Sequence, residues 1–165
     1  MDATARDALQ GQFGAAIDML ENAIRACPHE LWTAGQQRPE FWYLVYHTLF
    51  SLDLYLDDAT DGFSPPAPFT LSELDPTGVL PDRAYTKEEL LAYLDHGRRN
   101  AQARIAALTA DTACEECSYG WIRMSRVESL FYNMRHVQHH AAQLNLLLRQ
   151  LTNSAPPDWV PRSGF

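Results

Sequence analysis

The segment SRVESLFYNMRHVQHHAAQLNLLLRQL, residues 125–151, decides the fold class of this chain. Ser125 and Glu128 have the spacing of a capping box, in which two side chains satisfy free amides at the start of a helix. After them, apolar residues recur at intervals of three and four positions, which is the period of an α-helix with one buried face. We predict a helix over residues 126–151 that packs against a core. Its apolar residues are Val127, Leu130, Phe131, Met134, Val137, Ala141, Leu144, Leu148 and Leu151.

Three further segments have the same period, over residues 4–26, 40–58 and 87–109. The last of them begins with a second capping-box pattern, formed by Thr86 and Glu89. The middle one contains FWYLVYHTLFSLDLYLDD and is apolar on almost every side, so we expect it to be buried on more than one face. The core and a dimer partner together would provide that burial. No segment shows the alternation of apolar and polar residues that predicts a β-strand.

A long, proline-rich connection, residues 62–85, separates the second and third predicted helices. Connections of this length are uncommon in compact domains. In a four-helix bundle, a long crossover is needed where the chain must run the length of the bundle before the next helix begins. We therefore predict an all-α fold, with a single four-helix-bundle domain over residues 1–165. The tail after Asn153 contains three prolines and is expected to be extended.

Composition and charge exclude several classes of protein. Hydrophobic residues make up 46% of the chain and charged residues 21%, which is typical of a folded globular protein and not of a disordered one. No apolar run reaches the ~18–20 residues of a membrane span. The N-terminal residues lack the basic and apolar regions of a signal peptide, so we expect a cytoplasmic protein with no membrane partner. A net charge of -8 opposes nucleic-acid binding, because that binding depends on Lys and Arg side chains that neutralise phosphates.

The cysteines do not indicate a disulfide framework, because there are three of them, an odd number. Cys114 and Cys117 form an isolated C-x-x-C motif in the segment CEEC. The two glutamates between them disfavour the thiolate form that redox chemistry needs. We expect a reduced pair in a loop, with a redox or metal-binding role as the alternative.

Three of the six histidines lie together in RHVQHH, residues 135–140. His136 and His140 are four residues apart and therefore project from one face of the helix, as in the zinc-binding HExxH motif. The glutamate of that motif is missing, which excludes a metalloprotease. On a wheel of about 100° per residue, His140 lies about 40° from His136 toward the apolar arc, whereas His139 lies at about 300°. We therefore predict that His136 and His140 border the core and that His139 lies at the surface or just outside the ligand positions.

His47 is the candidate for a third metal ligand. It lies in the middle of the apolar second helix, with Leu44 and Ser51 on the same face. An unpaired imidazole in such surroundings is costly, and metal sites in bundles are built from side chains on facing helices. The alternative is a core histidine with a hydrogen-bonded ring. His29, in a predicted turn, and His96, among polar residues, are weaker candidates.

At these residues the chain resembles the DinB/YfiT-like superfamily of DinB-like metalloproteins. The resemblance rests on FWYLVYHTLFSLDLYL and RHVQHHAAQLNLLLRQ and covers nearly the whole chain. Members commonly read H-x-x-H-H-R-G-Q-[LI] at the second stretch. This chain keeps His136, the paired histidines and Gln143, but it has Ala141 and Ala142 in place of Arg-Gly.

The resemblance implies that His47, His136 and His140 bind one divalent metal ion, with nickel or zinc as the expected metal. It also implies a homodimer. Characterised relatives include thiol-dependent transferases and mycothiol-dependent maleylpyruvate isomerases, which implies a low-molecular-weight thiol as cosubstrate. No further cofactor is expected.

We therefore expect a metal-dependent thiol S-transferase or isomerase that acts on a small molecule. A metal-dependent hydrolase and a non-catalytic dimeric stress-response or binding module are the alternatives. Gln143 lies about 20° from His136 on the wheel, where it could orient a bound water or ligand. Glu40, Tyr43 and Asp58 lie on the same side as His47, and none of them can be assigned an acid or base role from the sequence.

Overall fold

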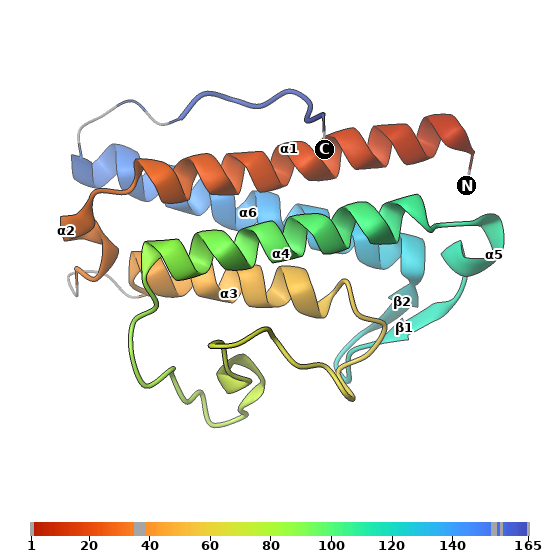
Figure 1. Cartoon of the computed structure of the whole chain (residues 1–165), viewed down its shortest axis with the longest axis horizontal. Coiled ribbons are helices and arrows are strands. Elements are labelled where there is room, and N and C mark those ends of the chain that lie inside the picture. Colours follow the sequence, from red (N-terminus) through yellow and green to blue (C-terminus); the bar gives the residue numbers. More distant parts are fainter. Residues whose placement is uncertain (1, 35–38, 153–154, 156, 165) are drawn as a thin grey trace.

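Four long helices form a bundle in the computed structural model, which describes residues 2–34, 39–152, 155 and 157–164 (Figure 1). They are α1 (Ala3–Ala26), α3 (Phe41–Leu54), α4 (Lys87–Ala106) and α6 (Arg126–Thr152). Helices α1 and α3 each pack against both α4 and α6, so the core lies along the axis between the four. The prediction of an all-α four-helix bundle is confirmed. No helix in the described part of the chain is both long enough and apolar enough to cross a membrane.

The crossover takes the course that the sequence predicts. Helices α3 and α4 run in the same direction, so the chain returns along the bundle between them (Figure 1). This return segment contains one short 3-10 helix, η1 (Ser72–Leu74). The long connection is thus explained by the direction of the two helices that it joins.

The crossover also buries the outer face of α3. Phe69 packs its ring against Tyr93 of α4, with ring centroids 4.3 Å apart, and against Tyr46 of α3, with centroids 6.2 Å apart. Tyr46 donates a hydrogen bond of 2.8 Å to the carbonyl of Thr70, and Phe63 contacts Phe50. The all-round apolar character of α3 therefore needs no dimer partner, because the crossover covers the face that the core does not.

A small hairpin corrects the expectation that the chain contains no strand. Strands β1 (Glu116–Ser118) and β2 (Arg123–Ser125) pair in antiparallel register next to the start of α6, after the short helix α5 (Ala110–Ala113). Each strand has three residues, which is too short for a period of two to be recognised in the sequence. Cys117 is buried on β1, and Cys114 is exposed after α5. The prediction that the two cysteines lie in one loop is therefore wrong. Another short helix, α2 (His29–Trp32), joins α1 to the segment that leads to α3.

Helix α3 ends at Leu54, four residues earlier than the predicted limit of residue 58. The last carbonyl groups of a helix have no partner within the helix and must find one elsewhere. Here side chains from other elements supply the partners, and the chain turns away to meet them. In each case a side chain donates to a backbone carbonyl: Asn133 to that of Leu52 (2.9 Å), Ser129 to that of Tyr55 (3.1 Å), Arg104 to that of Leu56 (2.5 Å) and Tyr119 to that of Asp57 (2.8 Å).

The C-terminal tail lies along α1 (Figure 1). The amide of Ser163 donates to the carbonyl of Gly11 (3.0 Å), and Gln12 donates to the carbonyl of Pro161 (3.1 Å). A Cβ atom on Gly11 would lie 2.9 Å from Cζ of Arg162, so glycine permits this close approach. The tail is therefore extended, as predicted.

We predict that Tyr119→Phe lowers the free energy of unfolding by about 1–3 kcal/mol. It removes the donor from the part-buried carbonyl of Asp57, just beyond α3, and one of the two donors from the buried carbonyl of Tyr55. The Tyr119 hydroxyl and Ser129 Oγ are 2.8 Å apart, so the two side chains act on this helix end together. Urea unfolding of Tyr119→Phe, Ser129→Ala and the double variant measures the effect. A double variant that costs less than the sum of the single ones is expected. If the losses of the two single variants simply add in the double variant, or if each is below about 0.5 kcal/mol, Tyr119 and Ser129 do not stabilise the end of α3 together.

Candidate metal centre

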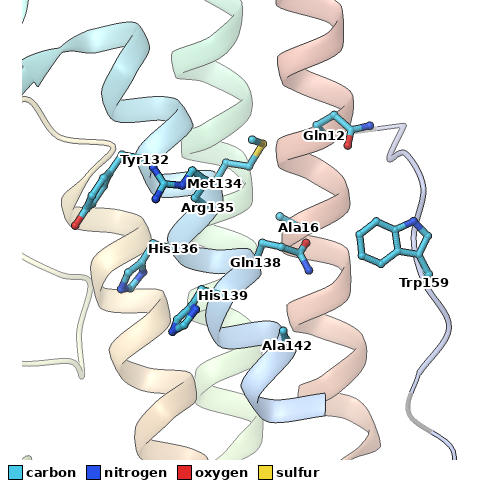
Figure 2. Close-up of a pocket in the computed structure, with 10 residues that line it drawn as sticks. All are labelled: Gln12, Ala16, Tyr132, Met134, Arg135, His136, Gln138, His139, Ala142 and Trp159. Carbon is cyan, nitrogen blue, oxygen red and sulfur yellow. The ribbon is translucent and has the colours of Figure 1, made fainter. Parts of the chain in front are cut away.

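The structure brings together the three histidines that the sequence singles out. His47 lies in the middle of α3, and His136 and His140 lie one turn apart on α6, which packs against α3. One ring nitrogen from each lies within 4.8 Å of the other two, and all three residues are half-buried. Nε2 of His136 and Nε2 of His140 are 3.1 Å apart. Figure 2 shows how His136 projects from α6 toward α3.

In two of the three imidazoles, Nδ1 lies within hydrogen-bond distance of an acceptor oxygen. Nδ1 of His47 is 2.6 Å from Oε2 of Glu73, and Nδ1 of His140 is 2.7 Å from Oε1 of Gln143. In each case the acceptor oxygen places the ring hydrogen on Nδ1, which leaves Nε2 free for another partner. Metal-binding histidines are usually oriented in this way by a group that accepts a hydrogen bond from the other ring nitrogen.

His136 differs from the other two. Its Nδ1 is buried and has no hydrogen-bond partner among the described residues, so its Nε2 makes the ring's one polar contact, with His140. Burial, together with the neighbouring histidines, lowers the pKa of His136 to about 3. Burial also lowers the pKa of His140, to about 4, although Gln143 acts in the opposite direction. Both rings are therefore neutral at pH 7 and carry the free lone pairs that a metal ligand needs.

Glu73, which the sequence analysis missed, belongs to this site. It lies on η1 in the crossover, and its side chain is only 8% exposed. Burial alone would raise the pKa of Glu73, but hydrogen bonds from His47 and Tyr43 outweigh it and hold the pKa below its usual value. Glu73 is therefore a carboxylate that faces an imidazole in a mostly buried position. No periodic pattern marks this residue, because the 3-10 helix that holds it has only three residues.

The remaining candidates lie elsewhere or have other partners. His139 is exposed on α6, with its ring centroid 5.0 Å from that of His140, as expected for a residue outside the ligand positions. His29 is exposed on α2, and His96 contacts Asp53 between α3 and α4. Neither belongs to the histidine cluster. Asp58 pairs with two arginines, Arg104 and Arg126, and Glu40 accepts a hydrogen bond from Trp42, so neither carboxylate faces the cluster.

Comparison with known families agrees with this arrangement. A model of the DinB superfamily matches residues 5–144, a span that includes all three histidines, the crossover and Gln143. The chain belongs to the DinB superfamily. No curated protein matches the sequence.

The histidines of this DinB protein can be reached from outside. A hollow of about 700 Å³, which we call the histidine hollow, opens beside His47 and His140. Its lining is formed by Pro39, Tyr43, Leu44, His47, Glu73, His140, Gln143, Leu146 and Leu147. His136 borders a different hollow of about 620 Å³, which passes over α6 to Trp159 of the tail (Figure 2). A small molecule that enters the histidine hollow would meet two of the three imidazoles.

Proposed function

We propose that this DinB-superfamily protein binds one divalent metal ion, zinc or nickel, through His47, His136 and His140. The observation that carries the proposal is the convergence of three imidazole nitrogens. Two of the rings are oriented by hydrogen bonds from Nδ1 to Glu73 and to Gln143. Three nitrogen ligands suit zinc and nickel, whereas calcium and magnesium prefer oxygen. Three protein ligands also leave a coordination position open, which is typical of catalytic sites and not of structural ones.

We further propose that the site serves a thiol S-transferase or isomerase. An ion held by these residues would lower the pKa of a thiol that reaches it and so supply a nucleophile near neutral pH. In thiol addition to an electron-poor double bond, the sulfur–carbon bond forms and the thiol proton ends on the neighbouring carbon, so nothing is oxidised or reduced. The superfamily resemblance and the open histidine hollow support this activity.

The chain's own residues have separate tasks in this proposal. Glu73 and Gln143 orient the rings of His47 and His140, and the apolar wall formed by Leu44 and Leu147 keeps water away from the reacting groups. The hydroxyl of Tyr43 lines the same hollow and is the one phenol there among the described residues. Burial, with the carboxylate of Glu73 beside it, raises the pKa of Tyr43 well above its usual range, so this hydroxyl stays protonated. Its hydrogen bond goes to Glu73, and its oxygen can accept a hydrogen bond from a substrate.

We also propose a homodimer, supported by the superfamily resemblance and by apolar side chains on the outer face. Phe131 on α6 is 46% exposed, and Trp121 on the hairpin is 58% exposed. Contiguous exposed apolar patches often mark an interface, and we propose that these two side chains belong to one. Sedimentation equilibrium is expected to give a dimer for the native chain and a monomer for Phe131→Glu. The matched change Leu71→Glu, at a leucine that is 47% exposed on the crossover, should leave the dimer intact. A native chain that sediments as a monomer would end this part of the proposal.

Metal analysis of protein purified without a histidine tag tests the metal site. We expect close to one equivalent of divalent metal per chain and its loss in the double variant His136→Ala plus His140→Ala. The matched control is His139→Ala, which removes an exposed histidine from the same stretch of α6 and should retain the metal. Retention of metal by the double variant, or far less than one equivalent in the native chain, would contradict the site.

Glu73→Gln should weaken metal binding by about 10- to 100-fold, because it replaces the charged acceptor that orients His47. Competition with a chromophoric chelator measures the change. Asp75→Asn is the matched control, since Asp75 is an exposed carboxylate two residues away whose hydrogen bonds go to Thr77. Equal affinities for the Glu73→Gln and Asp75→Asn variants would show that the contact between His47 and Glu73 has no effect on the metal.

Incubation of the metal-loaded protein with a thiol and an electrophilic acceptor tests the reaction. Bacillithiol, mycothiol and glutathione are compared, and we expect at least one of them to give an S-conjugate or an isomerised acceptor at a rate that falls after chelation. Product formed from water in the absence of thiol would favour the hydrolase alternative. If the metal-loaded protein turns over nothing in either assay, the non-catalytic binding module is favoured.

A further inference from the structure

The histidine hollow does not end at the histidines. A second hollow of about 490 Å³ is lined by Pro39, Glu40, Trp42, Tyr43 and Leu80, and it shares Pro39 and Tyr43 with the first. The two adjoin at these residues, and together we call them the Tyr43 groove. Trp42 precedes His47 by five residues on α3, which corresponds to about 7.5 Å along the helix axis. The groove thus leads away from the histidines over more than one helical turn.

The walls of the Tyr43 groove are mostly apolar. Leu44, Leu146 and Leu147 line the part near the histidines, and Trp42 and Leu80 line the far part. Leu146 is 52% exposed and Leu80 is 50% exposed. Single exposed leucines are common on protein surfaces. These two, however, lie on α6 and on the crossover and border the same groove, which matches small-molecule sites with apolar walls and a few polar groups.

The charges of the Tyr43 groove disfavour an anionic ligand. Its described lining contains two carboxylates, Glu40 and Glu73, and no lysine or arginine. Oε2 of Glu40 accepts a hydrogen bond of 2.6 Å from the indole of Trp42, and Glu73 faces His47. A carboxylate on a ligand in the far part of the groove would lie near Glu40 with no side-chain cation in that lining to compensate it, which costs binding free energy.

We propose that the acceptor substrate of this protein has an uncharged, apolar body that extends from the histidines past Tyr43 to Trp42 and Leu80. The inference rests on the proposed function, because the metal site defines the end of the groove where the reacting group lies. It adds a substrate class: an electrophile with a polar reacting end and an aliphatic or aromatic body longer than one helical turn. Small dicarboxylic acceptors do not belong to this class, because a second carboxylate would lie against apolar side chains and near the carboxylate of Glu40.

Three hydroxamic acids with the same metal-binding head test the proposal on the metal-loaded protein by calorimetry. Acetohydroxamic acid has a methyl tail, hexanohydroxamic acid has a tail with four further methylenes, and adipic monohydroxamic acid ends in a carboxylate. We expect the hexanoyl compound to bind at least tenfold more tightly than the acetyl compound, since each buried methylene contributes about 0.8 kcal/mol, which is roughly fourfold. The compound that ends in a carboxylate should bind at least tenfold more weakly than the hexanoyl one. Equal binding of either pair would overturn the proposal.

A matched pair of variants assigns the effect to the groove. Leu146→Ala should reduce the ratio of hexanoyl to acetyl affinity by at least threefold. Leu151→Ala, at a leucine that is 47% exposed on the same helix and outside the groove lining, should leave this ratio unchanged. Both side chains are exposed, so neither change is expected to prevent folding. Equal ratios for the two variants would show that the tail binds elsewhere.

A measurement that needs no metal separates this inference from the proposed function. Methyl NMR of the metal-free chain, titrated with 1-hexanol and with hexanoate, should show shifts of the Leu80 and Leu146 methyl groups for the alcohol and weaker ones for the acid. A chain that holds no metal but shows these shifts would refute the metal site and retain the apolar groove. A chain that holds metal but responds to hexanoate as strongly as to hexanol would refute the substrate class alone.

Discussion

Helices α3 and α4 point in the same direction, and much of the remaining structure is arranged around this constraint (Figure 1). Two parallel neighbours cannot be joined by a short turn, so the chain must return along the bundle. During this return it buries the outer face of α3 with Phe63 and Phe69 and brings Glu73 to His47. A segment whose regular structure is one short 3-10 helix thus completes the core and one end of the candidate site at the same time.

The three imidazoles have three different surroundings, and this difference is chemically meaningful. His47 faces a carboxylate, His140 an amide oxygen, and His136 has no acceptor at its buried Nδ1. A carboxylate is a stronger hydrogen-bond acceptor than an amide oxygen. His136, whose buried Nδ1 has neither, has its pKa lowered to about 3 by burial and the neighbouring histidines. The crossover therefore supplies the partner of the histidine on α3, while the surroundings of the two histidines on α6 depend on the local sequence of that helix.

Much of this arrangement could be predicted from the sequence because it depends on local periodicity. The spacing of His136 and His140 and the apolar arc around them place the pair at the edge of the core, and the wheel separates His139 from them. His47 could be recognised because an imidazole is out of place in an apolar helix. These features require only that the segments be helical, and the capping boxes and apolar periods establish that.

The features that could not be predicted depend on contacts between distant segments. Helix α3 ends early because Asn133, Ser129 and Tyr119 bind carbonyl groups at and just beyond its end, and those residues lie 62 to 81 residues further along the chain than the carbonyls that they bind. The hairpin is too short to have a period, and Glu73 meets His47 only after the crossover has folded back. A sequence pattern describes the structure that each segment prefers by itself, whereas these features depend on the tertiary contacts that the segment makes.

The contact between His47 and Glu73 makes the crossover a reporter of the site. Because Glu73 holds the imidazole from the crossover, docking of this segment and orientation of the ring belong to one equilibrium. Thermodynamic linkage is reciprocal, so any ligand that favours the oriented ring favours the docked segment by the same free energy. A protease that cuts only the undocked crossover would then cleave the liganded chain more slowly, by the factor that this coupling sets. Occupancy of a site between two helices could in this way be followed from the outside of the molecule, on an unlabelled chain.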